Sequence, residues 1–405
     1  MKVLQISNKI PYPEKDGGAI AINAITDGLI QSGCEVKLLA MNTKKHFIDI
    51  ASIPEKFRNE RHLEAVPIDT SVKPLDAFTA MLLGKSYNIS RFESEDFRKR
   101  LIEILQKEKF DVIHLDGLFV ALYLKTIREN SDAPTILRTH NVEWKIWKKL
   151  ASEEKPGFKK WYLNKLTKQL RRYEEYAINY FDGIATITEV DLNDFKKAGC
   201  KVPMVNIPFG IDVSKYNPTA CKYPNTLFFI GALDWLPNLQ GLDWFLKNVW
   251  NDIHTKFPQT QFHVAGRNMP DSLKNSGYKG VIFHGEIEDA KTFMQDYNLM
   301  IVPLLAGGGM RVKIIEGMAM GKPIITTDKG IEGIECSFGQ EVIVKDSTKD
   351  FGEAVCSLIQ DSNAALSLGQ NGRKLVEEHY DIGKILKKLV QFYEERIKSK
   401  GQTNA

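Results

Sequence analysis

The residues best suited to chemistry in this sequence lie in one short stretch of its second half. Three consecutive glycines, Gly307, Gly308 and Gly309, stand between an apolar run and a segment whose apolar residues recur at helical spacing. Because glycine has no side chain, such a loop lets the backbone approach a ligand closely. The N–H groups at the start of the following helix carry a positive partial charge, which favours an anion.

Three charged side chains continue this stretch. Arg311 and Lys313 place two cations in the first turn of the predicted helix, where the helix dipole ordinarily disfavours positive charge. An anion such as a diphosphate at the loop would explain their position. Glu316 follows, and its carboxylate could accept two hydrogen bonds from vicinal hydroxyls such as those of a ribose. The alternative is a tight turn with a surface ion pair, but glycines, cations and carboxylate coincide at one strand end, which favours the ligand site.

Two other nucleotide-binding motifs do not fit this sequence. The segment 317–322 is one residue short of a P-loop, with Glu316 in place of its first glycine and Pro323 in place of its Ser or Thr. The first predicted strand is not followed by GxGxxG, so a dinucleotide oxidoreductase has little support.

The elements that must position these residues alternate between strand and helix. Residues 2–7 predict a strand, residues 21–30 a helix and residues 35–40 a second strand, which is a βαβ opening. The alternation restarts with a fresh strand at residues 227–231, after a stretch rich in Pro, Lys and Asn. We therefore predict an α/β protein with two Rossmann-like, doubly wound lobes that face each other across a cleft.

The predicted boundaries follow from this restart. The N-terminal lobe spans residues 1–205 and the C-terminal lobe spans residues 206–384. Residues 385–405 form a C-terminal helix that crosses back to the first lobe, with a frayed tail.

Composition narrows the class of protein. The chain has 405 residues, 43% of them hydrophobic and 26% charged, which is ordinary for a soluble globular protein. Its five cysteines are scattered and never form a CxxC pair, so neither a disulfide framework nor a zinc site is expected. No segment has the pattern of a signal peptide or of a transmembrane helix. The expected location is the cytoplasm, and a net charge of +4 is too small to imply nucleic acid.

Charge is nevertheless concentrated in residues 145–172. This segment holds ten Lys or Arg residues against two Glu, interleaved with Trp147, Phe158, Trp161 and Tyr162. The favoured interpretation is a solvated basic helical face whose aromatic residues anchor the helix to its lobe. The alternative is peripheral contact with the inner face of a membrane.

Several segments together resemble glycosyltransferase family 4, whose members are retaining enzymes of the GT-B fold. Residues 307–327 resemble the donor-site signature of that family, and residues 11–18 resemble its N-terminal glycine loop. Residues 207–212 resemble the interdomain signature. Residues 231–238 are similar to the opening of the second lobe in a subgroup linked to exopolysaccharide and surface-glycan synthesis.

The resemblance implies roles for individual residues of the donor site. Glu316 matches the second Glu of the family's E-x(7)-E pattern, which holds the nucleotide ribose. The first Glu would fall at Gly308, so backbone N–H groups replace it or sugar recognition differs. The Arg and Lys that many members carry after the first strand of the second lobe are missing from residues 232–240. We therefore expect Arg311 and Lys313 to supply the phosphate charge.

Four further residues are assigned by the same resemblance. Gly17 and Gly18 would lie near the diphosphate from the opposite lobe. Gly285 aligns with the loop that cups the base. His140 resembles the family histidine near the transferred sugar, although a hydrogen-bonded structural histidine is an equally good interpretation. The predicted catalytic set is thus Arg311, Lys313 and His140.

The predicted function is that of a retaining glycosyltransferase that uses a nucleotide-diphosphate-sugar and a glycan or lipid-linked acceptor in surface polysaccharide synthesis. The resemblance implies same-face attack through an oxocarbenium-like state, with the departing diphosphate accepting the proton of the acceptor hydroxyl. No DxD-type pair ends a predicted strand, so we expect no metal and no other cofactor. The alternatives are a nucleotide-sugar epimerase of the same fold and a degenerate module that binds a nucleotide sugar.

Overall fold

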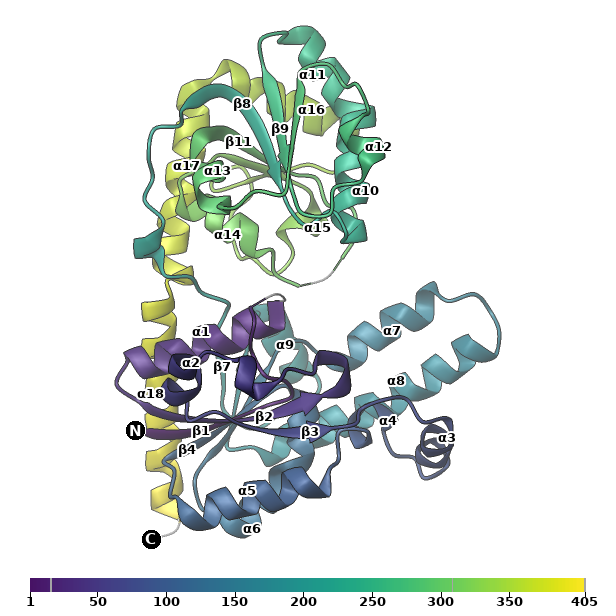
Figure 1. Ribbon diagram of the computed structural model, residues 1–405, viewed down its shortest axis with the longest axis vertical. Helices are drawn as coiled ribbons and strands as arrows, with labels where there is room; N and C mark the ends of the chain where they lie inside the picture. The colour runs from purple at the N-terminus through teal and green to yellow at the C-terminus, as the bar shows by residue number, and fades with distance from the viewer. Residues whose placement is uncertain (15–16, 308, 404–405) are drawn as a thin grey trace. The chain divides into compact units, whose positions relative to one another are not determined.

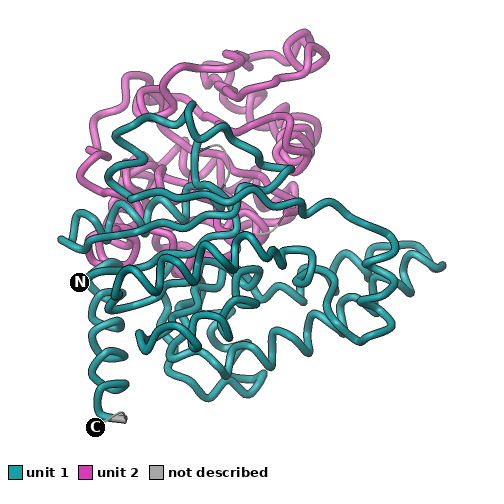
Figure 2. Tube along the Cα trace, turned by 60° about the horizontal axis from the view of Figure 1, so that its bottom comes forward, with its two compact units in different colours: residues 1–208, 385–405 teal, residues 209–384 magenta. Residues whose placement is uncertain are grey.

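The computed structural model describes residues 1–14, 17–307 and 309–403. It divides into two compact units, which are coloured separately in Figure 2. Unit 1 comprises Met1–Pro208 together with Ile385–Ala405, and unit 2 comprises Phe209–Lys384. Within the described residues, no helix is long and apolar enough to cross a bilayer.

Unit 1 is built on a parallel sheet of seven strands among its described residues, in the order β3-β2-β1-β4-β5-β6-β7. The strands are β1 (Lys2–Ser7), β2 (Glu35–Thr43), β3 (Glu64–Ile68), β4 (Val112–Asp116), β5 (Thr135–Thr139), β6 (Gly183–Thr186) and β7 (Met204–Asn206). The strand order reverses between β1 and β4, whose ends Ser7 and Asp116 are paired. In a doubly wound sheet, ligands bind outside the carboxyl ends of the strands at this reversal.

Helices cover both faces of this sheet (Figure 1). The helices of unit 1 are α1 (Gly17–Gln31), α2 (Glu55–Glu60), α3 (Pro74–Leu82), α4 (Tyr87–Ser90), α5 (Glu95–Lys107), α6 (Leu124–Asn130), α7 (Glu143–Glu153), α8 (Phe158–Ala177), α9 (Glu189–Lys197) and α18 (Ile382–Thr403). In α5 the Ser94 hydroxyl caps the helix, and Phe97, Leu101 and Ile104 recur on the face that is buried against the sheet. Helices α7 and α8 pack against each other as a hairpin.

Helix α18 starts in unit 2 and belongs to unit 1 from Ile385 onward. Two glycines of unit 1 leave room for its side chains: a Cβ atom on Gly28 would lie 1.7 Å from Leu386, and one on Gly183 would lie 2.6 Å from Phe392. Tyr393 is fully buried, and its hydroxyl lies 2.5 Å from Nδ1 of His114 in β4. The C-terminal helix is therefore an integral part of the core of unit 1.

Unit 2 repeats the architecture with a parallel sheet of six strands in its described part, in the order β10-β9-β8-β11-β12-β13. The strands are β8 (Tyr223–Ile230), β9 (Gln261–Ala265), β10 (Val281–Gly285), β11 (Tyr297–Val302), β12 (Ile324–Thr326) and β13 (Ile343–Val344). The helices around it are α10 (Leu236–Phe245), α11 (Asn251–Lys256), α12 (Asp271–Lys274), α13 (Ala290–Asp296), α14 (Val312–Ala319), α15 (Asp328–Ile331), α16 (Thr348–Gln360) and α17 (Ser362–Leu375) (Figure 1). The predicted pair of Rossmann-like α/β folds is thus confirmed.

Candidate functional site

Closely packed glycines shape the carboxyl ends of the central strands of unit 2. Gly231 follows β8 and Gly266 follows the neighbouring β9. The Gly231 N–H donates to the carbonyl of Ala265 at 3.1 Å, and a Cβ atom on Gly266 would lie 2.0 Å from the Gly231 carbonyl oxygen. Only glycine fits at Gly266, so the two strand ends can lie in contact and leave the edge of the sheet open for a ligand.

The predicted glycine loop connects β11 to α14. Gly307 has φ +106° and Gly309 has φ +84°, values in the left-handed region that glycine adopts most readily. Gly308 lies outside the described residues. The loop starts at Pro303, whose carbonyl oxygen would lie 2.2 Å from a Cβ atom on Gly241 of α10. A glycine in α10 therefore allows that helix to pack directly against the start of the loop.

Arg311 lies at the N-cap of α14 and is only 7% exposed. Its guanidinium lies 5.1 Å from the ring centre of Trp235, a cation–π distance. A Cβ atom on Gly307 would lie 2.8 Å from this guanidinium and 2.9 Å from the Trp235 ring. Burial lowers the pKa of Arg311. The structure thus holds this cation against the glycine loop.

Lys313 lies two residues further into α14 and is partly buried. Its ammonium donates to the backbone carbonyl of Ile230 at 3.0 Å and to Oδ1 of Asn238 at 2.9 Å. Burial, reinforced by the charge of Arg311, lowers the pKa of Lys313 to about 7. A diphosphate at this place would favour the protonated form, since an adjacent negative charge raises the pKa of an amine.

Glu316 lies on the same helix, one turn after Lys313. Its Oε1 accepts a hydrogen bond from the hydroxyl of Tyr216 at 2.8 Å, and Lys291 lies 4.4 Å from the centre of the Tyr216 ring. Burial raises the pKa of Glu316, while Tyr216 and Lys291 act in the opposite direction. A carboxylate has more acceptor positions than one hydroxyl fills, so the geometry is compatible with the predicted hydrogen bonds to a ribose.

Gly285 ends β10 with φ +72°, and its carbonyl accepts a hydrogen bond from the Gly266 N–H at 2.7 Å. Among the described residues other than its chain neighbours, none has a heavy atom within 4 Å of the place that its Cβ atom would occupy. The space beside this backbone is therefore open, which a loop that cups a base through its main chain requires.

In unit 1, a polar network occupies the carboxyl ends of β4 and β5. Asp116 is 1% exposed; its carboxylate accepts a hydrogen bond from Gln5 at 2.6 Å and lies 3.5 Å from the Arg138 guanidinium. Nε2 of His140 lies 3.3 Å from Asp116, and Nε2 of His114 lies 3.4 Å away. Burial alone would raise the pKa of Asp116, but these cationic and hydrogen-bonding neighbours lower it well below its usual range.

His140 is the member of this network that reaches the surface. Its side chain is 22% exposed, whereas the side chains of Asp116 and His114 are fully buried. Burial lowers the pKa of His140, partly offset by Asp116. Asp116 thus fixes the imidazole of His140 at the strand end, while burial of the ring favours its neutral form.

The predicted residues are distributed over both units. Unit 1 holds Gly17 and Gly18, which begin α1, and the network around His140. Unit 2 holds the other described residues of the predicted site, which are Gly285, Gly307, Gly309, Arg311, Lys313 and Glu316. Their combination into one site stays a prediction. Within the described part of the chain, no three His, Cys, Asp or Glu side chains are grouped so that they could hold a metal ion.

Sequence reasoning missed three neighbours of these residues. Tyr216, Trp235 and Asn238 contact Glu316, Arg311 and Lys313 respectively. Trp235 and Asn238 lie in the segment that resembles the opening of the second lobe, and this resemblance was the only available signal. Tyr216 lies a hundred residues before its partner and carries no signal of its own.

Comparisons with known proteins agree with this fold. The family model described as "Glycosyltransferase Family 4" matches residues 15–215, and the model described as "Glycosyl transferases group 1" matches residues 224–361. A protein of Klebsiella pneumoniae described as an uncharacterized 44.6 kDa protein in the cps region is 25% identical over 96% of this chain and 98% of its own length.

Solved structures with the same fold include a sucrose-phosphate synthase and the protein HepE. Sucrose-phosphate synthase from Thermosynechococcus elongatus matches with a TM-score of 0.68 at 15% identity, covering 98% of this chain and 100% of that one. HepE from Anabaena in complex with UDP matches with a TM-score of 0.66 at 13% identity and the same coverage. At these identities the likeness shows the fold alone.

Proposed function

Since the chain belongs to the family 4 glycosyltransferases of the GT-B fold, we propose that it is a retaining, hexosyl-transferring enzyme that uses a nucleotide-diphosphate-sugar donor. Its proposed acceptor is a glycan or a lipid-linked saccharide in surface polysaccharide synthesis. The observation that carries the proposal is the start of α14, where Arg311, Lys313 and Glu316 follow the glycine loop at the carboxyl edge of the sheet.

In the proposed reaction, unit 2 stabilises the leaving group. The oxygen of the acceptor hydroxyl bonds to the anomeric carbon of the sugar as the bond from that carbon to the diphosphate oxygen breaks. Negative charge accumulates on the departing diphosphate, which takes the proton of the hydroxyl. Arg311, Lys313 and the N–H groups of α14 would face this charge in a partly buried setting, where preorganised donors stabilise a developing anion most strongly. Glu316 would hold the ribose, and the backbone at Gly285 the base.

His140 is the proposed contact of unit 1 with the transferred sugar. Asp116 fixes one ring nitrogen of His140, so the imidazole has a set orientation and the rest of the ring faces outward. A neutral imidazole hydrogen-bonds a sugar hydroxyl without placing a full charge next to the cationic transition state. Gly17 and Gly18 would accommodate the diphosphate from this unit, and no metal or other cofactor is proposed.

Two observations support the proposed biological setting: the description of the Klebsiella pneumoniae relative and the exposed aromatic residues of unit 1. The cps region that gives the Klebsiella pneumoniae relative its description suggests a role in surface glycan synthesis. We place the protein in the cytoplasm, in peripheral contact with the membrane through residues 145–172. Phe158 and Trp161 support this contact because they are 79% and 52% exposed and leave their aromatic surface open to solvent.

Calorimetric binding of UDP, GDP and ADP tests the donor site. HepE in complex with UDP makes UDP the first choice. We expect the wild type to bind one of the three nucleotides, the Glu316→Ala variant to lose at least about tenfold in affinity, and Glu353→Ala, an exposed change on α16, to bind normally. If none of the nucleotides binds, or if Glu316→Ala binds as well as the wild type, the donor site is wrongly assigned. The anomeric configuration of the product, read by NMR, then tests retention.

A further inference from the structure

A cavity lies in unit 1, bounded by α4, by the segment leading into α6 and by the C-terminal half of α8. Its volume is about 920 Å³. Pockets for small ligands commonly have volumes of roughly 300–1,000 Å³. None of the predicted transferase residues lines it, so the proposed reaction leaves it without a role.

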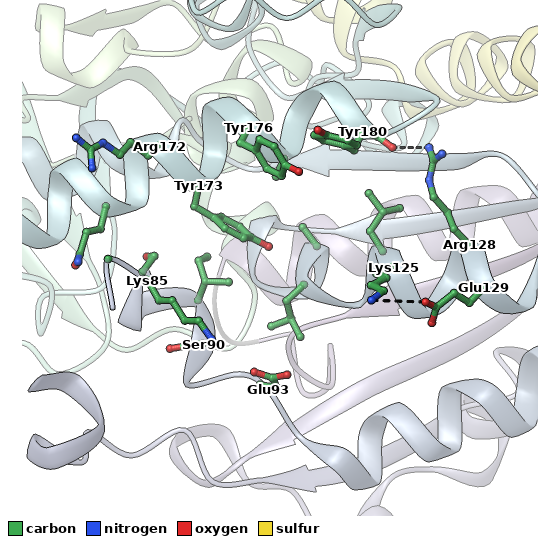
Figure 3. Close-up of a pocket in the computed structure, with 18 residues that line it drawn as sticks. Lys85, Ser90, Glu93, Lys125, Arg128, Glu129, Arg172, Tyr173, Tyr176 and Tyr180 are labelled. Atoms are coloured by element: carbon green, nitrogen blue, oxygen red, sulfur yellow. Dashed lines mark hydrogen bonds and ion pairs between the residues drawn. The ribbon is translucent and has the colours of Figure 1, made fainter. Parts of the chain in front are cut away.

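The walls of this cavity are mainly apolar. Ile89, Leu122 and Leu124 contribute aliphatic surface. Tyr173, Tyr176 and Tyr180 line the opposite wall (Figure 3). Tyr173 and Tyr176 lie one turn apart on α8, and Tyr180 continues their face just after the helix ends. Such a lining suits a hydrocarbon chain better than a soluble polar ligand, because few polar groups are available to replace lost hydration.

Four cations and two carboxylates, Glu93 and Glu129, line the cavity, and two of the cations have no ion-pair partner among the described residues. Lys125 pairs with Glu129 at 3.8 Å, and Arg128 lies 3.6 Å from Asp182. By contrast, Lys85 and Arg172 form no ion pair or hydrogen bond through their side chains with any described residue. Figure 3 shows both of them on the side of the cavity away from Lys125 and Glu129. A ligand with a hydrocarbon chain and an anionic head would satisfy both features.

The exterior next to the cavity is also apolar. Helix α3, which ends just before Lys85, buries its small residues Ala77 and Ala80 and exposes Leu75, Phe78 and Leu82 on one face, at 80%, 55% and 69%. A helix of a soluble protein normally does the reverse. Nine of the twenty large hydrophobic side chains that are exposed among the described residues fall within 72–83 and 146–161. Such a concentration marks an interaction surface, and exposed apolar and aromatic side chains of this kind suit contact with a bilayer.

We propose that this cavity binds one hydrocarbon chain of an anionic membrane phospholipid, with the lipid phosphate at Lys85 and Arg172. The proposal concerns a site separate from the donor site. It deepens the membrane contact of residues 145–172 by giving it a lipid ligand, and in that respect it rests on the proposed function.

Binding of alkyl phosphates below their micellar concentration tests the chain site. We expect affinity to rise from octyl to decyl to dodecyl phosphate, by up to about fourfold for each added CH₂ group. Ser90→Trp, which places a large ring into the cavity, should reduce dodecyl phosphate affinity at least tenfold, as should Tyr176→Asp. Tyr176 is 63% exposed, so the second variant folds even if the first does not. The matched control Val190→Trp, on the exposed side of α9, should bind as the wild type does.

A second pair of variants tests the phosphate position. Lys85→Glu with Arg172→Glu should weaken dodecyl phosphate at least tenfold and leave dodecyl maltoside, which has the same chain and a neutral head, unchanged. Lys99→Glu with Lys387→Glu applies the same charge change elsewhere on unit 1 and should alter neither ligand.

Vesicle co-sedimentation decides whether the lipid comes from a bilayer. We expect binding to vesicles that contain phosphatidylglycerol, no binding to pure phosphatidylcholine vesicles, and loss of binding in Ser90→Trp or Tyr176→Asp. Three results would each overturn the proposal. The first is an affinity that does not depend on chain length, and the second is competition by inorganic phosphate as strong as that by dodecyl phosphate. The third is binding of a soluble oligosaccharide that the Ser90→Trp substitution abolishes. UDP calorimetry on the same variants should be unaffected, so failure here is distinguishable from failure of the donor site.

Discussion

Replacing Lys313 by Met should make the ligand-free protein more stable at neutral pH and less stable at alkaline pH. Met preserves the length of the side chain and removes the amine that is buried beside Arg311. The wild-type pKa of about 7, against an ordinary 10.5, means that folding removes a proton from this lysine. Between these two pH values the unfolded chain holds a proton that the folded protein lacks, so the free energy of unfolding rises with pH across this window.

The magnitude follows from that shift and from the hydrogen bonds that are lost. A difference of 3.5 pKa units at pH 7 corresponds to about 4–5 kcal/mol of destabilisation that Met does not suffer. Met leaves the acceptors on Ile230 and Asn238 unfilled, which costs about 2–3 kcal/mol. The variant should therefore be more stable than the wild type by about 2 kcal/mol at pH 7. At pH 9.5 the lysine penalty falls to about 1–2 kcal/mol, and the variant should be less stable by about 1 kcal/mol.

Urea unfolding of both proteins at pH 7 and pH 9.5 measures this reversal. Lys149→Met, an exposed change on α7, controls for the loss of one positive charge and should stay within about 0.5 kcal/mol of the wild type at both pH values. Lys313→Met should also bind the donor nucleotide about 10–100-fold more weakly, so stability and binding change in opposite directions at pH 7. A difference in unfolding free energy that does not vary with pH would refute the reasoning, since the lysine would then titrate normally in the folded protein.

Three further predictions concern other parts of the structure. Asp116→Asn should destabilise the protein by about 3–5 kcal/mol in thermal unfolding because the buried Arg138 loses its counter-charge, and Arg138→Met in the same chain should recover part of that loss. His263 is 6% exposed, and burial lowers its pKa from 6.5 to about 4. As the pH falls, the unfolded chain therefore binds a proton at this histidine before the folded protein does. The free energy of unfolding should fall by about 2 kcal/mol between pH 7 and pH 5. His263→Phe should remove that pH dependence, and a variant as pH-sensitive as the wild type would exclude this histidine as its source. Gly241→Ala should cost about 1–3 kcal/mol because its Cβ atom would lie 2.2 Å from a backbone oxygen, whereas Gly352→Ala on α16, with 3.4 Å available, should be neutral or slightly stabilising.

Much of the architecture could be predicted because it follows from the local periodicity of apolar residues. Alternating apolar runs and helical patterns predict the βαβ opening at residues 2–40 and the second start at β8, and both are present. Glycines followed by charged residues predict the start of α14 within a residue. These features depend on neighbours within about a dozen positions, which a single sequence shows directly.

The rest depends on contacts between residues that are distant in the chain. The hydroxyl of Tyr216 reaches Glu316 across a hundred residues, and no pattern in the intervening sequence announces this contact. The sequence also does not show which side chains are buried, so the low pKa of Lys313 could not be predicted from its position on a helix. The aromatic residues of 145–172 show both outcomes: Trp147 and Tyr162 pack against the body of unit 1 as expected, but the expectation is wrong for Phe158 and Trp161, which are exposed.

The place of α18 in unit 1 bears on how the protein is made. His114 and its partner Tyr393 are separated by 279 positions, and the whole of unit 2 lies between them in the chain. During synthesis the N-terminal unit therefore emerges with the grooves at Gly28 and Gly183 unfilled, while unit 2 already has its complete sequence. Helix α18 is therefore made after unit 2 and completes the core of unit 1, and a chain released before Tyr393 lacks the partner of His114 and leaves that core open to chaperones and proteases.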